Sequence, residues 1–211
     1  SPDGALLATA DTAGTVRLWG VGADAKELAS FDGFAGGALS LAFAPDGSLL
    51  AAGGADRSLR LYDVAGRRET IRLENQAGAV LSLAFGPEAK TLASGCRGGA
   101  LSLWSLSGAK QPALLAGHSD SVHSLAFASS GHLLASAAGS GDIRLWNPAG
   151  RKEAGRLGGH VDKVSAVAFS PKGATLASGS ADGTVRLWDA ATGSEIARLQ
   201  GHAGKVYAVA F

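Results

Sequence analysis

The sequence predicts an all-β protein built from five copies of one small sheet. An apolar run of six residues recurs along the chain, and glycine-rich turns follow one another too closely for long helices. A third observation fixes the repeat length, because one aromatic position returns after 43 residues and then after every 42 residues. These aromatic positions are Trp19, Tyr62, Trp104, Trp146 and Trp188.

The first element of each repeat is the apolar run. It is apolar at consecutive positions, as expected of a strand that packs against neighbouring sheets on both faces. A turn written APDG, GPEA, ASSG or SPKG follows, and turns with proline or glycine join antiparallel strands. We therefore predict a hairpin after each run. The runs are residues 38–43, 80–85, 122–127, 164–169 and 206–211.

Three further strands complete each repeat. In the last full repeat the second strand reads ATLASGS, and the third ends in TVRLWD, where Val185 and Leu187 alternate with Arg186 and Trp188. The fourth strand, EIARL, carries more charge, which suits an edge in contact with water. Four short antiparallel strands per repeat are typical of one blade of a β-propeller.

The whole chain, residues 1–211, is expected to form one propeller domain. The residues after Trp188 and those up to Trp19 together make one repeat length. We therefore expect the run 206–211 to pair with a strand at Leu6–Ala10, in the same chain or in a neighbouring copy. The outcome is a closed five-blade ring or part of a larger propeller. The expected repeat units are 1–31, 32–73, 74–116, 117–157 and 158–199, with 200–211 completing the first blade.

Charge and composition argue against nucleic acid and membranes as partners, and they suggest a cellular compartment. Lys and Arg number 19 against 18 Asp and Glu, so no net field favours nucleic acid or a membrane surface. No apolar stretch reaches the length of a membrane span, and the first residues lack the pattern of a signal peptide. The single Cys96 fits a reducing compartment, so we expect a cytoplasmic protein. The chain starts within a repeat and has no methionine, which predicts a piece of a longer protein.

The dipeptide Gly159-His160, followed by a strand, a hairpin and Trp188-Asp189, resembles the WD-repeat family of β-propellers, and the resemblance runs along the whole chain. High Ala, Gly and Arg usage is typical of bacterial arrays of this family. The resemblance implies that each blade holds a structural set of hydrogen-bonded side chains. In the last full repeat this set is His160, Ser178, Asp182 and Trp188.

Other repeats keep the implied set in part. In one of them Ser140 stands where the aspartate is expected, and in another Gln76 and Gly98 replace histidine and aspartate. The wrapped first repeat combines residues from both ends of the chain. The partial sets are His118, Ser136 and Trp146, then Ser94 and Trp104, and then His202, Thr9 and Trp19.

The same side chains suggest a hydrolase, because a Ser-His-Asp trio is a nucleophile with its base. The trio recurs in altered form at a fixed offset from every aromatic, however, which one active site would not require. No nucleophile loop of the type G-x-S-x-G accompanies it. The histidines lack partners at metal-ligand spacing, and the glycine-rich turns lack the lysine of a phosphate loop. We therefore predict no catalytic residue, no metal and no cofactor.

We predict a non-catalytic scaffold that presents loops on one propeller face to proteins or peptides. The alternative is the regulatory or sensor array of a larger bacterial signalling enzyme, a kinase or ATPase, whose catalytic domain lies outside this chain. If five blades do not close alone, a homo-oligomer is expected. The family's habit of binding through three positions per blade implies a basic face with one aromatic side chain, suited to acidic or phosphorylated peptides. These positions are Lys205, Tyr207, Lys163, Ser165, Ser121, His123, Arg97 and Leu81.

Overall fold

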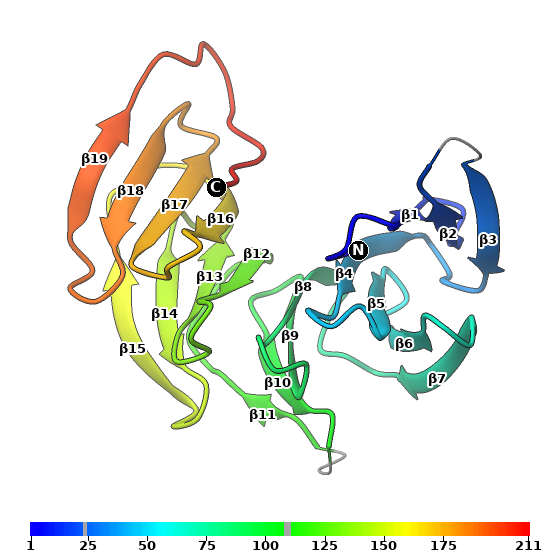
Figure 1. Cartoon of the computed structure of the whole chain (residues 1–211). Coiled ribbons are helices and arrows are strands. Elements are labelled where there is room, and N and C mark those ends of the chain that lie inside the picture. Colours follow the sequence, from blue (N-terminus) through cyan, green and yellow to red (C-terminus); the bar gives the residue numbers. More distant parts are fainter. Residues whose placement is uncertain (23–24, 108–110) are drawn as a thin grey trace.

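The computed structural model describes residues 1–22, 25–107 and 111–211, which form nineteen strands in five antiparallel sheets (Figure 1). The first sheet has three strands, and each of the other four has four. The predicted all-β architecture of five blades is therefore confirmed, with one strand fewer in blade 1. The part of the chain described contains no helix long and apolar enough to cross a membrane.

The blades follow one another along the chain, and each is a simple meander. Blade 1 consists of β1 (Leu6–Ala10), β2 (Val16–Gly20) and β3 (Lys26–Phe31). The others are β4 (Ala38–Phe43), β5 (Leu49–Gly54), β6 (Leu59–Asp63) and β7 (Arg68–Leu73); β8 (Val80–Phe85), β9 (Thr91–Cys96), β10 (Leu101–Ser105) and β11 (Ala113–Leu114); β12 (Val122–Phe127), β13 (Leu134–Ala138), β14 (Ile143–Asn147) and β15 (Lys152–Leu157); and β16 (Val164–Phe169), β17 (Thr175–Ser180), β18 (Val185–Asp189) and β19 (Glu195–Leu199).

The hydrophobic core lies between blades. Trp188 of blade 5 packs in one buried cluster with Ile143 and Leu145 of blade 4. Trp146 of blade 4 does the same with Leu101 of blade 3. Each aromatic therefore joins its own sheet to the preceding one, which explains why it recurs once per repeat. Trp19 has no preceding blade and is only half-buried.

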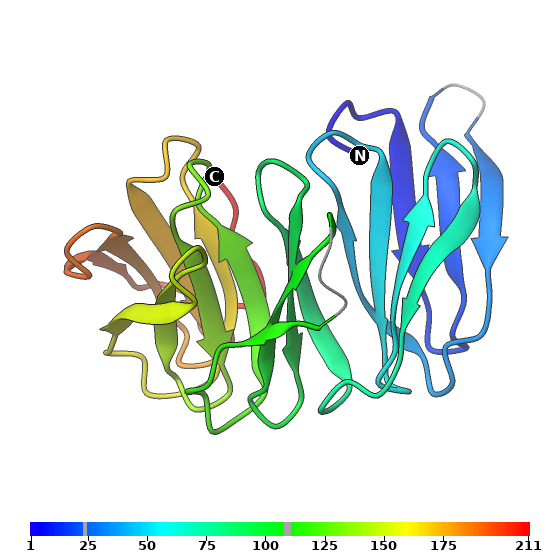
Figure 2. The same ribbon diagram turned by 90° about the horizontal axis from the view of Figure 1, so that it is seen from below.

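The five blades form an open arc, and the two chain ends lie on different arms of it (Figure 1). Figure 2 shows the sheets standing side by side, with their turns gathered at two opposite faces. We call the loop face the one formed by the segments that lead into the first strand of each blade and by the turns between second and third strands. The opposite face carries the remaining turns.

The expected pairing of residues 206–211 with Leu6–Ala10 is not formed within this chain. Strand β1 pairs with β2 alone, and the described residues 206–211 belong to no strand. Instead the Val206 amide donates to the Ser180 carbonyl at 2.9 Å, and the Val206 side chain packs over Gly179. Val122 packs over Gly95 in the same way. Residues 206–211 therefore dock on blade 5 as the first strand of a following blade does, and they lie far from β1 at the other end of the arc (Figure 1).

Candidate functional site

The complete side-chain set lies inside blade 5. The His160 ring joins the Ser178 hydroxyl through Nε2 and the Asp182 carboxylate through Nδ1, both at 2.8 Å, and the Trp188 indole donates to Ser178 Oγ at 2.8 Å. Burial lowers the pKa of His160, and the bond to Asp182 opposes that shift. Burial raises the pKa of Asp182, but hydrogen bonds from Thr184 and His160 hold it well below its usual range.

This arrangement ties strands together and offers no reaction centre. Ser178 has no exposed surface, and its oxygen already accepts the Trp188 indole hydrogen. A substrate therefore has no path to the hydroxyl. No group of three or more His, Cys, Asp or Glu side chains in the described residues is placed to hold a metal ion.

Blade 4 holds the same set without its carboxylate. His118 Nε2 lies 2.6 Å from Ser136 Oγ, and the Trp146 indole donates to that oxygen at 2.7 Å. His118 Nδ1 is buried and has no hydrogen-bond partner among the described residues, since Ser140 stands in the aspartate position. Burial, with Arg144 nearby, lowers the pKa of His118 to about 4.

The other partial sets reduce to one hydrogen bond each. Trp104 donates to Ser94 at 2.9 Å, and Trp19 donates to Thr9 at 2.8 Å. His202 was expected beside Thr9, but it is exposed and makes no hydrogen bond with it. The reason is that residues 200–211 continue from blade 5 on the other arm of the arc.

A second recurring pair was not predicted. Two residues before the aromatic, Arg186 donates to the Gly159 carbonyl at 2.6 Å and pairs with Glu195 on the next strand. Arg144 pairs with Glu153 in the same manner. The signal was present in the sequence, because this arginine keeps one offset from the aromatic in four of the five repeats. Its partners could not be assigned without the register of the third and fourth strands.

Three predicted partner-binding residues gather on the loop face of consecutive blades. Arg97 lies in the turn after β9, His123 on β12, and Lys163 just before β16. Burial lowers the pKa of His123, and the positive charges of Lys163 and Arg97 lower it further. Both cations therefore lie close enough to His123 to act on it. Among the described residues, Arg97 and Lys163 take part in no ion pair.

The remaining predicted residues surround these three or extend the face. Ser121 precedes β12, and its hydroxyl accepts from the Gly98 amide at 3.4 Å. Leu81 and Ser165 are half-buried on β8 and β16. Lys205 is exposed and Tyr207 is 74% exposed, on the segment that docks against blade 5.

Two acids on the same loops were missed by the prediction. Asp120 accepts a hydrogen bond from the Ser121 amide, and Asp162 accepts one from the Lys163 amide, both at 2.6 Å. Asp120 also acts on His123, raising its pKa against the effect of the nearby cations. The three basic residues therefore have carboxylates beside them on the loops before β12 and β16, so the loop face is not free of acids.

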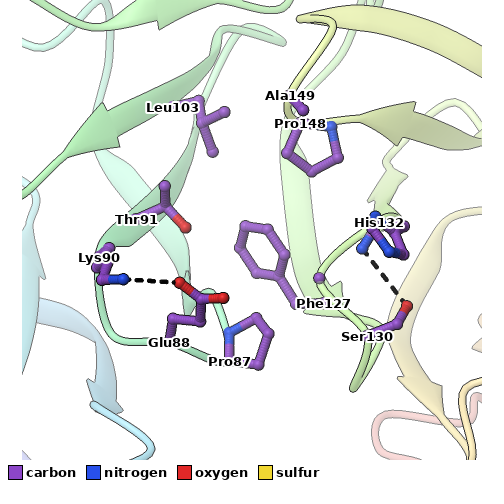
Figure 3. Close-up of a pocket in the computed structure, with 11 residues that line it drawn as sticks. Pro87, Glu88, Lys90, Thr91, Leu103, Phe127, Ser130, His132, Pro148 and Ala149 are labelled. Carbon is purple, nitrogen blue, oxygen red and sulfur yellow. Dashed lines mark hydrogen bonds and ion pairs between the residues drawn. The ribbon is translucent and has the colours of Figure 1, made fainter.

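The opposite face carries a shallow cavity of about 300 Å³ between blades 3 and 4. Figure 3 shows Phe127 between the turns that hold Pro87 and Pro148, with Lys90 paired to Glu88 at 3.0 Å. Its charged groups are already neutralised by one another. Nothing in this cavity favours a particular ligand.

Comparison with protein families assigns the repeats. The profile described as "WD domain, G-beta repeat" matches residues 25–63, 68–105, 109–147 and 151–189, more than half of the chain. The chain belongs to the WD40 family. Each matched WD40 repeat joins the outer strand of one blade to the three inner strands of the next, as residues 151–189 span β15 to β18. WD40 repeats generally act as scaffolds for protein–protein interaction, and WD40 propellers are generally not catalytic. A comparison with curated proteins gave no match.

Proposed function

We propose that this WD40 array is a non-catalytic scaffold whose loop face binds an acidic or phosphorylated segment of a partner protein. The observation that carries the proposal is the gathering of Arg97, His123 and Lys163 on three consecutive blades. A phosphate or a pair of carboxylates between these blades would meet two permanent cations that have no ion-pair partner among the described residues. Opposite charges of this kind guide association and set the register of a bound peptide.

The docked segment after blade 5 extends this face. Lys205 adds a further cation, and the exposed Tyr207 ring offers an aromatic contact of the kind that dominates many interfaces. A peptide that runs from Arg97 towards Tyr207 would carry its anionic group first and an apolar side chain next. The same face would serve if the chain is the sensor part of a larger signalling enzyme.

A homo-oligomer is a second proposal. No strand in the described part of the chain pairs with the inner edge of β1, and unpaired edges tend to pair with another chain. Leu7 on β1 and Phe211 at the C-terminus are both more than half exposed. Residues 206–211 of one copy would therefore supply β1 of another copy with its missing neighbour.

We also propose a reducing compartment, the cytoplasm. Cys96 is the only cysteine, it is buried as a free thiol, and burial raises its pKa. A thiol in this state is inert, so the fold depends on no oxidising step.

The test is a peptide array probed with wild type and two charge-reversal variants. The double variant Lys163→Glu, Lys205→Glu should lose the acidic and phosphorylated peptides that wild type binds. The matched control Arg151→Glu, Lys152→Glu makes the same charge change in the turn between β14 and β15, on the opposite face, and should keep them. If both variants lose the same peptides, or neither loses any, the loop face is not the binding site.

A further inference from the structure

Blade 3 departs from the other blades at the buried arginine. In those four blades an arginine stands two residues before the aromatic, and a glutamate lies opposite the aromatic on the outer strand, as Glu195 lies opposite Trp188. Blade 3 has Ser102 in place of the arginine. Ser102 pairs with Leu114 on β11, and this register places Gln111 where the others have glutamate. Both members of the ion pair are therefore absent from this blade.

A cavity of about 440 Å³ occupies this place. Its wall includes the two replaced positions, the aromatic between them and the segment that leads into the blade. The lining residues that matter here are Ser102, Gln111, Trp104, Glu74, Asn75 and Gln76.

Two polar side chains in this wall make no side-chain hydrogen bond with the described residues. Gln76 and Ser102 are each only 6% exposed, and their polar atoms are not sealed from the cavity. Buried amide and hydroxyl groups are normally paired, because leaving them unpaired is unfavourable. Both groups line the cavity, so a polar ligand within it would supply what the fold does not.

The charge and shape of the cavity favour a guanidinium. Arg72 and Glu74 both border it, but Arg72 is paired with Glu69 at 2.8 Å, and Glu74 has no ion pair among the described residues. The cavity therefore borders one carboxylate that makes no ion pair among the described residues, although Arg72 lies near enough to act on it electrostatically. Elsewhere in this molecule the equivalent space holds an arginine, since the Arg186 guanidinium lies 6.0 Å from the centre of the Trp188 ring.

We propose that the cavity of blade 3 binds an arginine side chain of a partner protein. The guanidinium takes the place that Arg186 has in blade 5, above the Trp104 ring and next to the Asn75 carbonyl, which is equivalent to the Gly159 carbonyl that Arg186 binds. It faces the Glu74 carboxylate and the Gln76 amide. This site accepts a cation and is separate from the loop-face cluster, which accepts an anion.

The test is a titration of the full chain with three short peptides. Binding is monitored by NMR through the indole N–H signals of the four tryptophans. The probes are acetyl-Gly-Arg-Gly-amide and the same peptide with citrulline or lysine at the centre. The arginine peptide should shift the Trp104 signal with saturation. The lysine peptide should bind roughly tenfold more weakly, and the neutral citrulline peptide should have no effect.

Two variants separate the proposal from a non-specific effect. Ser102→Arg with Gln111→Glu rebuilds the internal pair, so the protein should unfold at the same or a higher temperature and lose the shift. Glu74→Gln changes an exposed side chain and should weaken binding severalfold without loss of fold. The loop-face variant Lys163→Glu, Lys205→Glu should bind the arginine peptide as wild type does, whether or not the loop face binds acidic peptides.

The proposal is overturned if wild type shows no saturable shift of Trp104, or if the citrulline peptide binds as well as the arginine peptide. It is also overturned if Glu74→Gln and a folded Ser102→Arg, Gln111→Glu variant both keep the affinity of wild type.

Discussion

At the residue scale, the contrast between His160 and His118 shows what one missing carboxylate does. Each ring contacts, through Nε2, a serine hydroxyl whose oxygen accepts the tryptophan indole hydrogen, but His118 Nδ1 is buried with no hydrogen-bond partner among the described residues. With Nε2 accepting the serine hydroxyl hydrogen, Nδ1 carries the ring hydrogen without an acceptor. The sequence predicted the substitution of Ser140 for aspartate, but its electrostatic effect depends on burial, which the sequence does not state.

The lowered pKa of His118 predicts a dependence of stability on pH. The unfolded chain takes up a proton on this ring near its ordinary pKa of 6.5, while the folded chain resists it until about pH 4. Stability from this ring is therefore complete above pH 6.5 and is lost as the pH falls towards 4, by on the order of 3 kcal/mol. Denaturant unfolding at several pH values measures this loss. The free energy of unfolding of His118→Gln should fall less than that of wild type as the pH is lowered, because the variant has no ring to protonate. Equal losses in both proteins would contradict the assignment.

At the element scale, the strands and turns follow the sequence closely because each is specified locally. Two-residue alternation, apolar runs and proline or glycine turns suffice to place the strands of a meander. The arginine–glutamate pairs depend on which residues face each other across β18 and β19, where the register shifts between Leu187 and Trp188. A shift of this kind cannot be read from periodicity.

The aromatic of each blade should contribute more to stability than any charged residue on its surface. Trp188→Ala removes a side chain that is 2% exposed and that joins blades 4 and 5, so it should lower the free energy of unfolding by about 3–5 kcal/mol. Lys172→Ala, at an exposed turn, should change it by less than about 0.5 kcal/mol. Lys110, an obvious surface control from the sequence, lies outside the described residues. Similar unfolding temperatures for the two variants would contradict the role of Trp188.

At the scale of the whole molecule, the repeat phase was compatible with a closed ring or with part of a larger propeller, and the five blades form an open arc (Figure 1). The phase of the repeat shows only that the two chain ends together make one repeat length. Closure of a ring depends on the angle between blades, which is set by side-chain packing between them. The loop-face residues were predicted from their positions in the repeat, and three of them, Arg97, His123 and Lys163, lie on consecutive blades, while their binding role stays a prediction. Asp120 and Asp162 were missed because they lie between those positions, so their effect needed the loop geometry.

The open edges predict that association depends on the C-terminal segment. Deleting residues 206–211 removes the strand proposed to pair with β1 of another copy, so a dimer of wild type should become a monomer in sedimentation at matched concentration. The same deletion uncovers Gly179 and the neighbouring edge of blade 5, which should increase aggregation on heating. If the deletion changes neither the association nor the solubility of the protein, β1 is not completed by this segment.

The most direct test of the central claim is the pKa of His123, measured by NMR with and without the peptide acetyl-Glu-phosphoserine-Glu-amide. In the free protein, burial and the positive charges of Lys163 and Arg97 keep this pKa below its ordinary value. An anion bound among these groups offsets both charges, so the pKa should rise as the peptide saturates the site. The rise should be absent in the Lys163→Glu, Lys205→Glu variant and present in Arg151→Glu, Lys152→Glu. A His123 pKa that stays the same in wild type at every peptide concentration would contradict the claim that this face binds an acidic or phosphorylated partner.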